Sequence, residues 1–156
     1  MPSGTALALS TVFSVWRPTM KGKIFTVDEA TRMLPLVAHI ADDIVATYAE
    51  VNRSLQTYED AKAKADGDVA REGDLRRADA EVGDVLDRFQ RLIQEVEALG
   101  GTVKDYEQGF IDFYGDVDGE IVYLCWTRGE KAITHWHRLE EGFSKRRDLP
   151  VVNAAA

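Results

Sequence analysis

The stretch Thr26–Tyr58, TVDEATRMLPLVAHIADDIVATYAEVNRSLQTY, decides the fold. Thr26 and Glu29 have the spacing of a capping box, in which each side chain accepts a hydrogen bond from the backbone N–H of the other residue. A helix is therefore predicted to begin at Val27. Apolar residues then alternate by three and four, the spacing of a coiled-coil seam. They are Leu34, Val37, Ala41, Ile44, Tyr48, Val51, Leu55 and Tyr58.

Pro35 lies inside this predicted helix. A proline there removes one backbone hydrogen bond and crowds the preceding turn. We therefore expect a kink or a break between Arg32 and Leu36.

A second run repeats the pattern. Its seam consists of Leu75, Ala78, Val82, Val85, Phe89, Leu92, Val96 and Leu99. The turn-forming stretches Asp66-Gly-Asp68 and Glu72-Gly-Asp74 bracket the connector, and Gly100-Gly101 marks the end of the second helix. Two seams of equal length and a short connector predict an antiparallel helical hairpin over residues 27–99. Leu86 and Ile93 widen the second stripe, so either the C-terminal segment or a second protomer should cover it, and we expect a homodimer.

After Gly101 the pattern becomes that of strands, rich in aromatic and β-branched residues between glycines. The predicted strands are Thr102–Lys104, Phe110–Tyr114, Glu120–Trp126 and Lys131–Trp136. Ile121–Trp126 is apolar on both faces, which predicts a central strand. The predicted fold class is α+β, a long antiparallel coiled-coil-like helical hairpin followed by a small antiparallel β-meander. Residues 20–150 would be a single domain with its sheet module at 102–143. We expect residues 1–19 to be a poorly ordered extension or a start-codon artefact, and 151–156 a tail.

The charge balance narrows the class of partner. The 156-residue chain has 19 basic and 27 acidic residues and a net charge of -8. Such a field repels nucleic acid and anionic membrane, so neither is an expected partner. A single cysteine fits a cytoplasmic protein. The sequence contains no Walker loop, dinucleotide fingerprint, GxSxG or HExxH motif, so the signatures of the commonest enzyme classes are absent.

The rarest side chains gather in Cys125–Phe143, CWTRGEKAITHWHRLEEGF. On a strand, His135 and His137 share one face. With a thiolate from Cys125, or a carboxylate from Asp112 or Glu130, they form a ligand set for Zn²⁺ or another divalent transition metal. Whether they meet depends on the turn. A two-residue turn at Arg128-Gly129 points Cys125 away from His135, whereas a three-residue turn that includes Glu130 brings them to the same face.

Two further readings of this segment remain open. In one, Tyr123, Trp126, Trp136 and Phe143 form an aromatic core cluster, and the protein is a structural adaptor. In the other, an Asp112–arginine pair beside His137 makes a polar pocket in an aromatic wall. The residues predicted to line that pocket are Asp112, Cys125, Trp126, Glu130, Trp136, His137 and Arg146.

Several motifs together resemble a known family. They are Phe25-Thr-Val-Asp-Glu-Ala30, Leu34-Pro35-Leu36, Gly109-Phe-Ile-Asp-Phe113, Tyr123-Leu-Cys-Trp126, Gly129-Glu130, Trp136-His137 and Gly142-Phe143 with a following arginine. Over residues 20–150 the chain resembles the bacterial family called domain of unknown function 2203. The resemblance implies a small soluble protein without an established activity, and its polar signature falls on Asp112, Cys125, Glu130 and His137. His135 departs from the family pattern, which moves the expected site towards His137.

Two functional hypotheses follow. The first is a cytoplasmic binding or interaction module with a polar-aromatic pocket around His137. Its expected partners are a second copy of the chain and an unknown small molecule or protein. The alternative is a metal-dependent or His/Glu acid–base enzyme acting on a small molecule in a hydrolase-like reaction. In that enzyme His137 is the general base or a metal ligand, and Glu130 or Asp112 orients it.

Overall fold

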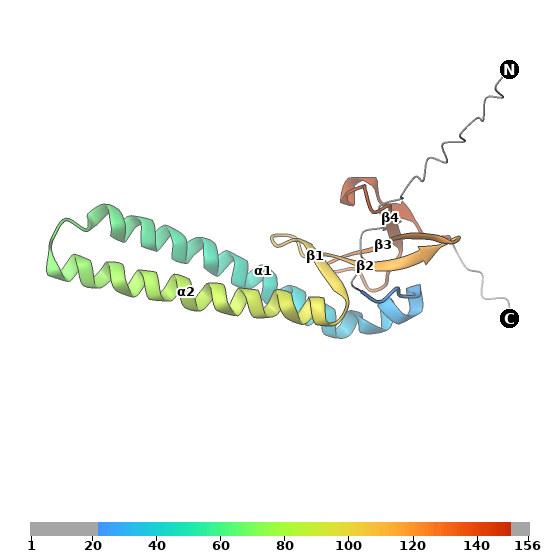
Figure 1. Cartoon of the computed structure of the whole chain (residues 1–156), viewed down its shortest axis with the longest axis horizontal. Helices are drawn as coiled ribbons and strands as arrows, with labels where there is room; N and C mark the ends of the chain where they lie inside the picture. The colour runs from blue at the N-terminus through green and yellow to red at the C-terminus, as the bar shows by residue number, and fades with distance from the viewer. Residues whose placement is uncertain (1–21, 151–156) are drawn as a thin grey trace, which may run out of the picture.

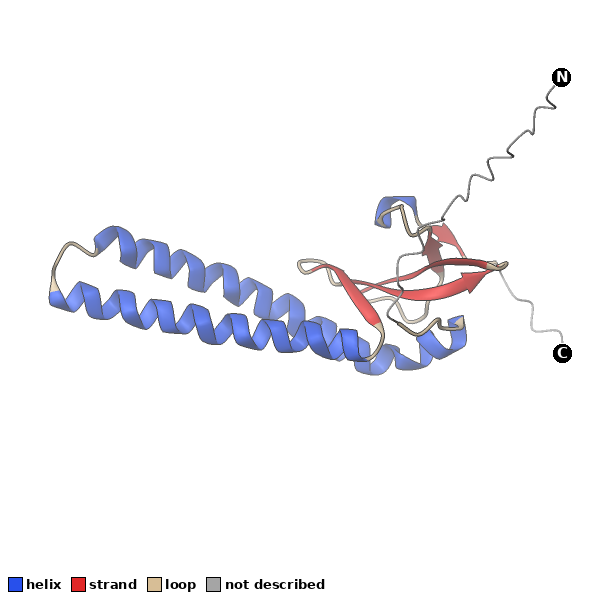
Figure 2. Ribbon diagram, in the orientation of Figure 1, coloured by secondary structure: helices blue, strands red, loops and turns tan. Residues whose placement is uncertain are grey.

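The computed structural model describes residues 22–150, so the predictions for residues 1–19 and 151–156 lie outside the described residues. Two long helices form a hairpin that extends away from a small sheet (Figures 1 and 2). The elements are α1 (Val27–Lys64), α2 (Val69–Ala98), β1 (Gly101–Asp105), β2 (Phe110–Val117), β3 (Glu120–Thr127), β4 (His135–His137), the 3-10 helix η1 (Phe143–Lys145) and β5 (Arg147–Asp148). The predicted α+β class, a helical hairpin followed by an antiparallel sheet, is confirmed. Neither helix combines the length and apolar character needed to cross a membrane.

Helix α1 begins where the capping box predicts. The Thr26 hydroxyl accepts from the Glu29 N–H at 3.1 Å, and a Glu29 carboxylate oxygen accepts from the Thr26 N–H at 3.1 Å. The helix then continues through Pro35 as one element, so of the predicted kink or break the break does not occur, and the kink stays a prediction. Leu34 and Val37 are buried on either side of the exposed proline, and their packing against the sheet holds the helix together there.

The face that α1 presents to α2 differs from the predicted seam in its second half. Thr47 and Ser54 are buried, while Leu55 is 41% exposed. The Ser54 hydroxyl donates to a backbone carbonyl of the preceding turn at 2.9 Å, so its burial leaves no donor unpaired. Tyr48, a predicted seam residue, packs beside the predicted seam residue Phe89 of α2, with ring centroids 5.8 Å apart. The heptad pattern missed this shift because a straight helix drifts relative to a seven-residue repeat.

The connector between the helices is shorter than the two glycine motifs suggested. Asp68 is the N-cap of α2, and its carboxylate accepts from the backbone N–H groups of Ala70 and Arg71. The Glu72-Gly-Asp74 stretch therefore lies inside α2, which corrects its assignment as part of the connector. The end of α2 agrees with the prediction, since Gly100 follows it in the left-handed region at φ 91.

The five strands form one antiparallel sheet in the order β1-β2-β3-β4-β5. The predicted central strand is confirmed, because β3 is the middle strand. The sequence did not predict η1 or β5, and β5 extends the sheet module to Asp148, beyond the predicted limit at residue 143.

The connection from β3 to β4 differs from both predicted turns. The fourth strand starts at His135 rather than Lys131, so seven residues, 128–134, separate the two strands. The Glu130 side chain accepts from the Thr127 N–H, and the Ile133 N–H donates to the Thr31 hydroxyl on α1. Ile133 is 4% exposed, so burial of its side chain in the core draws this loop towards α1 before the chain can return to the sheet.

The sheet has one apolar and one polar face. Ile111 and Phe113 of β2, with Val122, Leu124 and Trp126 of β3, belong to the same core cluster as the buried residues of the first half of α1. The opposite face, called the outer face below, carries Asp112, Tyr123, Cys125 and His137. The segment around η1 covers part of it, since Phe143 stacks on Phe110 at 3.8 Å.

Candidate functional site

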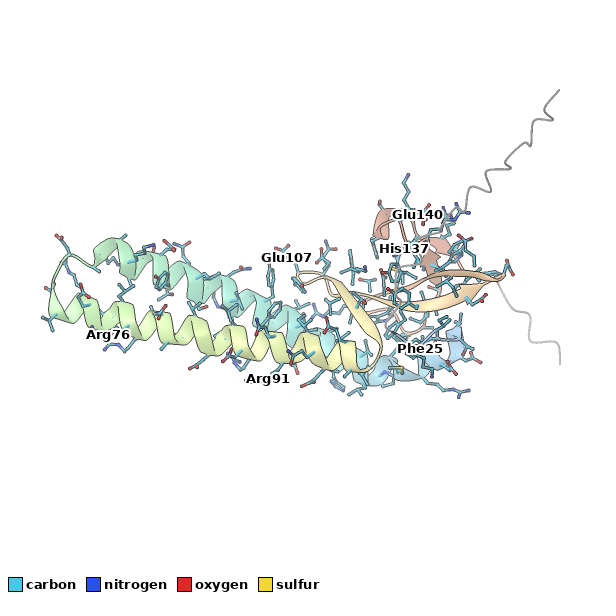
Figure 3. All side chains as sticks on the ribbon, viewed as in Figure 1. Phe25, Arg76, Arg91, Glu107, His137 and Glu140 are labelled. Atoms are coloured by element: carbon cyan, nitrogen blue, oxygen red, sulfur yellow. The ribbon has the colours of Figure 1, made fainter. Side chains whose placement is uncertain are left out.

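Strand register brings three chemically capable side chains together on the outer face. Asp112 on β2 lies opposite Cys125 on β3, and His137 on β4 lies opposite Tyr123, two residues before Cys125. One donor atom from each of Asp112, Cys125 and His137 lies within 4.8 Å of the other two. All three residues are buried. Figure 3 labels His137 among the side chains of the sheet module. We call these three residues the buried triad.

Hydrogen bonds fix the orientation of His137. Its Nδ1 lies 2.9 Å from the carbonyl oxygen of Arg138, and its Nε2 lies 3.0 Å from Oδ2 of Asp112. A carbonyl oxygen can only accept, so the Nδ1 must carry a proton. One further proton is then shared between Nε2 and Oδ2. The other carboxylate oxygen, Oδ1 of Asp112, is buried and has no hydrogen-bond partner within residues 22–150.

The buried environment disfavours the charged forms of the Asp112 carboxyl and the Cys125 thiol. Burial raises the pKa of the Asp112 carboxyl, and the neighbouring His137 opposes this rise. Burial, together with the nearby Asp112 charge, raises the pKa of the Cys125 thiol to about 12, while Arg146 opposes the rise. Cys125 is therefore a neutral thiol near pH 7 and not an activated nucleophile.

Glu130 belongs to a different set of contacts from the predicted acid–base trio. One of its oxygens accepts from Arg146 Nη1 at 2.8 Å, and the other accepts from the Thr127 N–H at 3.0 Å. Arg146 also lies over the Phe143 ring, 4.3 Å from its centroid. Of the predicted catalytic residues His137, Glu130 and Asp112, the structure therefore pairs only the first and last.

His135 is next to the triad and makes separate contacts. It lies opposite Cys125 in the ladder, but its Nε2 is 3.0 Å from an Asp148 oxygen and its Nδ1 is 2.8 Å from the Thr134 hydroxyl. Of the predicted metal ligands His135, His137 and Cys125, the last two come together. Asp112, which the sequence analysis named as an alternative carboxylate ligand, completes the cluster in place of His135.

Comparison with known families decides the relationship that the motifs suggested. The family model described as "Uncharacterized conserved protein (DUF2203)" matches residues 23–149. The chain belongs to the DUF2203 family. Comparisons with curated proteins and with solved structures found no match. The family match covers all three residues of the buried triad, and it carries no described activity to transfer to them.

The aromatic residues of this DUF2203 chain are divided between the two faces of the sheet. Trp126 and Trp136 pack with the inner core, whereas Tyr123 and Phe143 lie with the outer face, so the predicted single aromatic cluster is wrong. The alternation of side chains along β3 separates Tyr123 from Trp126. The Trp126 Nε1–H donates to the Glu130 carbonyl at 2.8 Å, and both residues border an open hollow of about 510 Å³ beside α1.

A larger groove lies elsewhere, where the start of α1 meets the β2–β3 turn and the β4–β5 region. It has a volume of about 660 Å³. Its lining consists of Val27, Asp28, Asp116, Val117, Asp118, Ile133, Thr134, Asp148, Leu149 and Pro150. We call it the acidic groove, because the described residues that line it include four aspartates and no basic residue. The sequence analysis did not identify this groove, since its residues come from four separate stretches whose meeting no local pattern signals.

Proposed function

We propose that this DUF2203 protein is a cytoplasmic binding module whose acidic groove takes a segment of a partner protein that combines apolar side chains with lysine or arginine. The observation that supports this proposal is the composition of the groove. Five apolar residues, Val27, Val117, Ile133, Leu149 and Pro150, accompany the four aspartates. Apolar side chains of a partner would gain from burial against the former, and its cations would interact with the latter.

The carboxylates of the groove are available to a partner. Asp28, Asp116, Asp118 and Asp148 are all exposed. Among residues 22–150, only Asp148 of these four has an ion-pair partner, His135. The protein's negative field adds to the local effect, so a basic segment would be attracted over a distance of about one Debye length, roughly 8 Å at physiological salt.

The shape of the groove favours a protein segment over an enclosed small molecule. Sites for small ligands bury most of the ligand surface. Six of the ten lining residues here are exposed, which leaves the groove open to solvent along its rim. An extended segment can lie across such a surface and place only some of its side chains in it.

Catalysis by the buried triad is the alternative hypothesis. The Asp112–His137 pair favours it, because a histidine oriented by a carboxylate is a common general base. However, the side chains of His137 and Asp112 are only 3% and 2% exposed, and Glu130 is engaged with Arg146. The buried pair therefore offers almost no surface to a substrate. We therefore place binding ahead of catalysis.

The homodimer stays a proposal about the hairpin. A second protomer was expected to cover Leu86 and Ile93. Ile93 already packs against the core of its own chain, so it no longer needs such a partner. Leu86 remains 37% exposed and Leu55 41% exposed. Sedimentation velocity of the wild type and a Leu55→Gln/Leu86→Gln variant tests whether these side chains hold two copies together.

The binding proposal is tested with synthetic fluorescent peptides of one length that alternate leucine with either lysine or glutamate. The lysine peptide should bind, with an affinity that falls as salt rises, and the glutamate peptide should not. The variant Asp28→Asn/Asp116→Asn/Asp118→Asn should lose most of this binding.

The matched control is Glu72→Gln/Asp79→Asn/Asp87→Asn on α2, where all three acids are exposed and the change of net charge is the same. Equal losses in the two variants would mean that the peptide responds to net charge alone, and the groove proposal would then be wrong.

A further inference from the structure

The buried triad has a feature that an ordinary buried ion pair does not explain. The Asp112–His137 contact uses Oδ2, and Oδ1 of Asp112 is buried with no hydrogen-bond partner among residues 22–150. An unpaired buried carboxylate oxygen is costly, and proteins rarely retain one without a reason. The donor atom of Cys125, the single cysteine of the chain, also lies inside the same cluster.

We propose that Asp112, Cys125 and His137 form a binding site for a divalent transition metal of the zinc type. Carboxylate, thiolate and imidazole are all ligands that Zn²⁺ accepts, and a thiolate selects against Mg²⁺ and Ca²⁺. The proposed site differs from the HxH pair of the sequence analysis because it uses Asp112 in place of His135. It is independent of the acidic groove and of the peptide binding proposed there.

The geometry of the cluster is close to that of a ligand set. Two tetrahedral zinc ligands with bonds of about 2.0–2.3 Å lie about 3.5 Å apart. The three donor atoms here lie within 4.8 Å of one another, and the Nε2 and Oδ2 atoms are already 3.0 Å apart. Small rotations of the side chains would therefore bring all three donors to bonding distance.

The second hydrogen bond of His137 has the form expected around a metal. A histidine that binds a metal through one nitrogen usually donates its other N–H to a carboxylate or a backbone carbonyl, which fixes its tautomer. The His137 Nδ1 makes this bond to the Arg138 carbonyl at 2.9 Å, and so directs Nε2 into the cluster.

Metal binding would leave the three residues of the buried triad, taken together with the ion, electrically neutral. Without metal, the shared proton neutralises the Asp112–His137 pair, and the Cys125 thiol keeps its own proton. The ion would form bonds to Sγ, Nε2 and a carboxylate oxygen, while those two protons leave to solvent. The two negative charges of Asp112 and Cys125 then balance the two positive charges of the metal. Within residues 22–150 no fourth His, Cys, Asp or Glu joins the cluster, so a tetrahedral ion has one position for another ligand.

The test uses untagged full-length protein stripped with chelator and then loaded with Zn²⁺ or Co²⁺. We expect one zinc per chain after gel filtration, measured by elemental mass spectrometry. Cobalt should give the absorption of a thiolate-to-cobalt charge transfer, which requires Cys125 as a ligand and needs no variant. Zinc should also slow alkylation of Cys125 in the wild type.

Three variants assign the ligands. Asp112→Asn and Cys125→Ser should each weaken zinc binding by about tenfold to 100-fold or more. Cys125→Ser should also abolish the charge-transfer band. His135→Gln is the matched control and should keep both the stoichiometry and the spectrum, because its contacts are to Asp148 and Thr134. The proposal would be overturned by wild-type protein that retains no stoichiometric zinc and shows no charge-transfer band. Equal loss of zinc in His135→Gln, or full retention in Asp112→Asn, would overturn it as well.

Discussion

The contact between Asp112 and His137 should dominate the stability of the metal-free sheet module. The two side chains are 2% and 3% exposed, and the Nε2–Oδ2 distance is 3.0 Å. Removing one member of such a pair leaves the other buried without its partner, at a cost of about 3–5 kcal/mol. His137→Leu should therefore lower the free energy of unfolding by an amount in this range. Asp112→Ala should cost somewhat less, because the remaining neutral histidine loses only one hydrogen bond.

The double variant separates this contact from the effects of shape. In Asp112→Ala/His137→Leu neither polar group remains to be buried alone. We expect it to be at least about 2 kcal/mol more stable than the sum of the two single changes predicts. Urea unfolding at pH 7 with chelator present measures all four proteins. With an m value of about 1.5 kcal/mol per M, a loss of 3 kcal/mol moves the midpoint by about 2 M.

His39→Leu is the control for replacing a histidine, because His39 is exposed on α1 and should change stability by less than about 0.5 kcal/mol. Single-variant losses that add to within about 0.5 kcal/mol in the double variant would refute the reasoning, since they would show that the pair carries no coupling.

Three further predictions concern separate contacts. Hydrogen bonds from Arg147 hold the pKa of Glu141 at about 2, below its ordinary value. The stabilisation that the Glu141–Arg147 contact gives the folded state should therefore be complete above about pH 4.5 and be lost as the pH falls towards 2. In a carboxylate NMR titration, Arg147→Gln should raise that pKa, and an unchanged value would contradict the assignment. The Cys125 thiol, with its pKa raised to about 12 by burial, should react with iodoacetamide at pH 8 far more slowly in the metal-free folded protein than in urea, and equal rates would show that the site is open. Gly115→Ala should cost about 1–3 kcal/mol in urea unfolding, because its Cβ would lie 2.5 Å from a leucine side chain on β3. Gly142→Ala, which meets nothing within 4 Å, should change stability little, and similar losses in both would rule out the steric explanation.

Local patterns predicted the elements that depend on neighbouring residues. The capping box fixed the start of α1 at Val27, and Gly100 marked the end of α2, because both signals act through backbone groups only a few residues away. Periodicity predicted the helical hairpin and identified β3 as the central strand. The same reasoning failed at Leu55, which is exposed although the seam predicted its burial, and α1 has no break at Pro35.

The sequence identified the residues of the candidate site, but it did not predict which of them come together. Asp112, Cys125 and His137 were all among the residues singled out, because polar side chains are unexpected in strands of such apolar character. Which of them meet depended on the β3–β4 connection, and a change of one residue in register moves every side chain to the other face. The position of this connection is fixed by Ile133, which is buried in the core and whose N–H donates to the Thr31 hydroxyl, 102 residues earlier in the sequence.

The sequence by itself determined the two helices, the start of α1, the end of α2 and the change to strands after Gly101, since periodicity and capping are local properties of the chain. Tertiary structure alone decided that Asp112 joins Cys125 and His137, and that four aspartates from separate stretches border one groove. The physical reason is that strand register and groove shape follow from burying the core residues of the whole chain at once. The free energy of that burial is shared among distant segments, and no single stretch of sequence contains it.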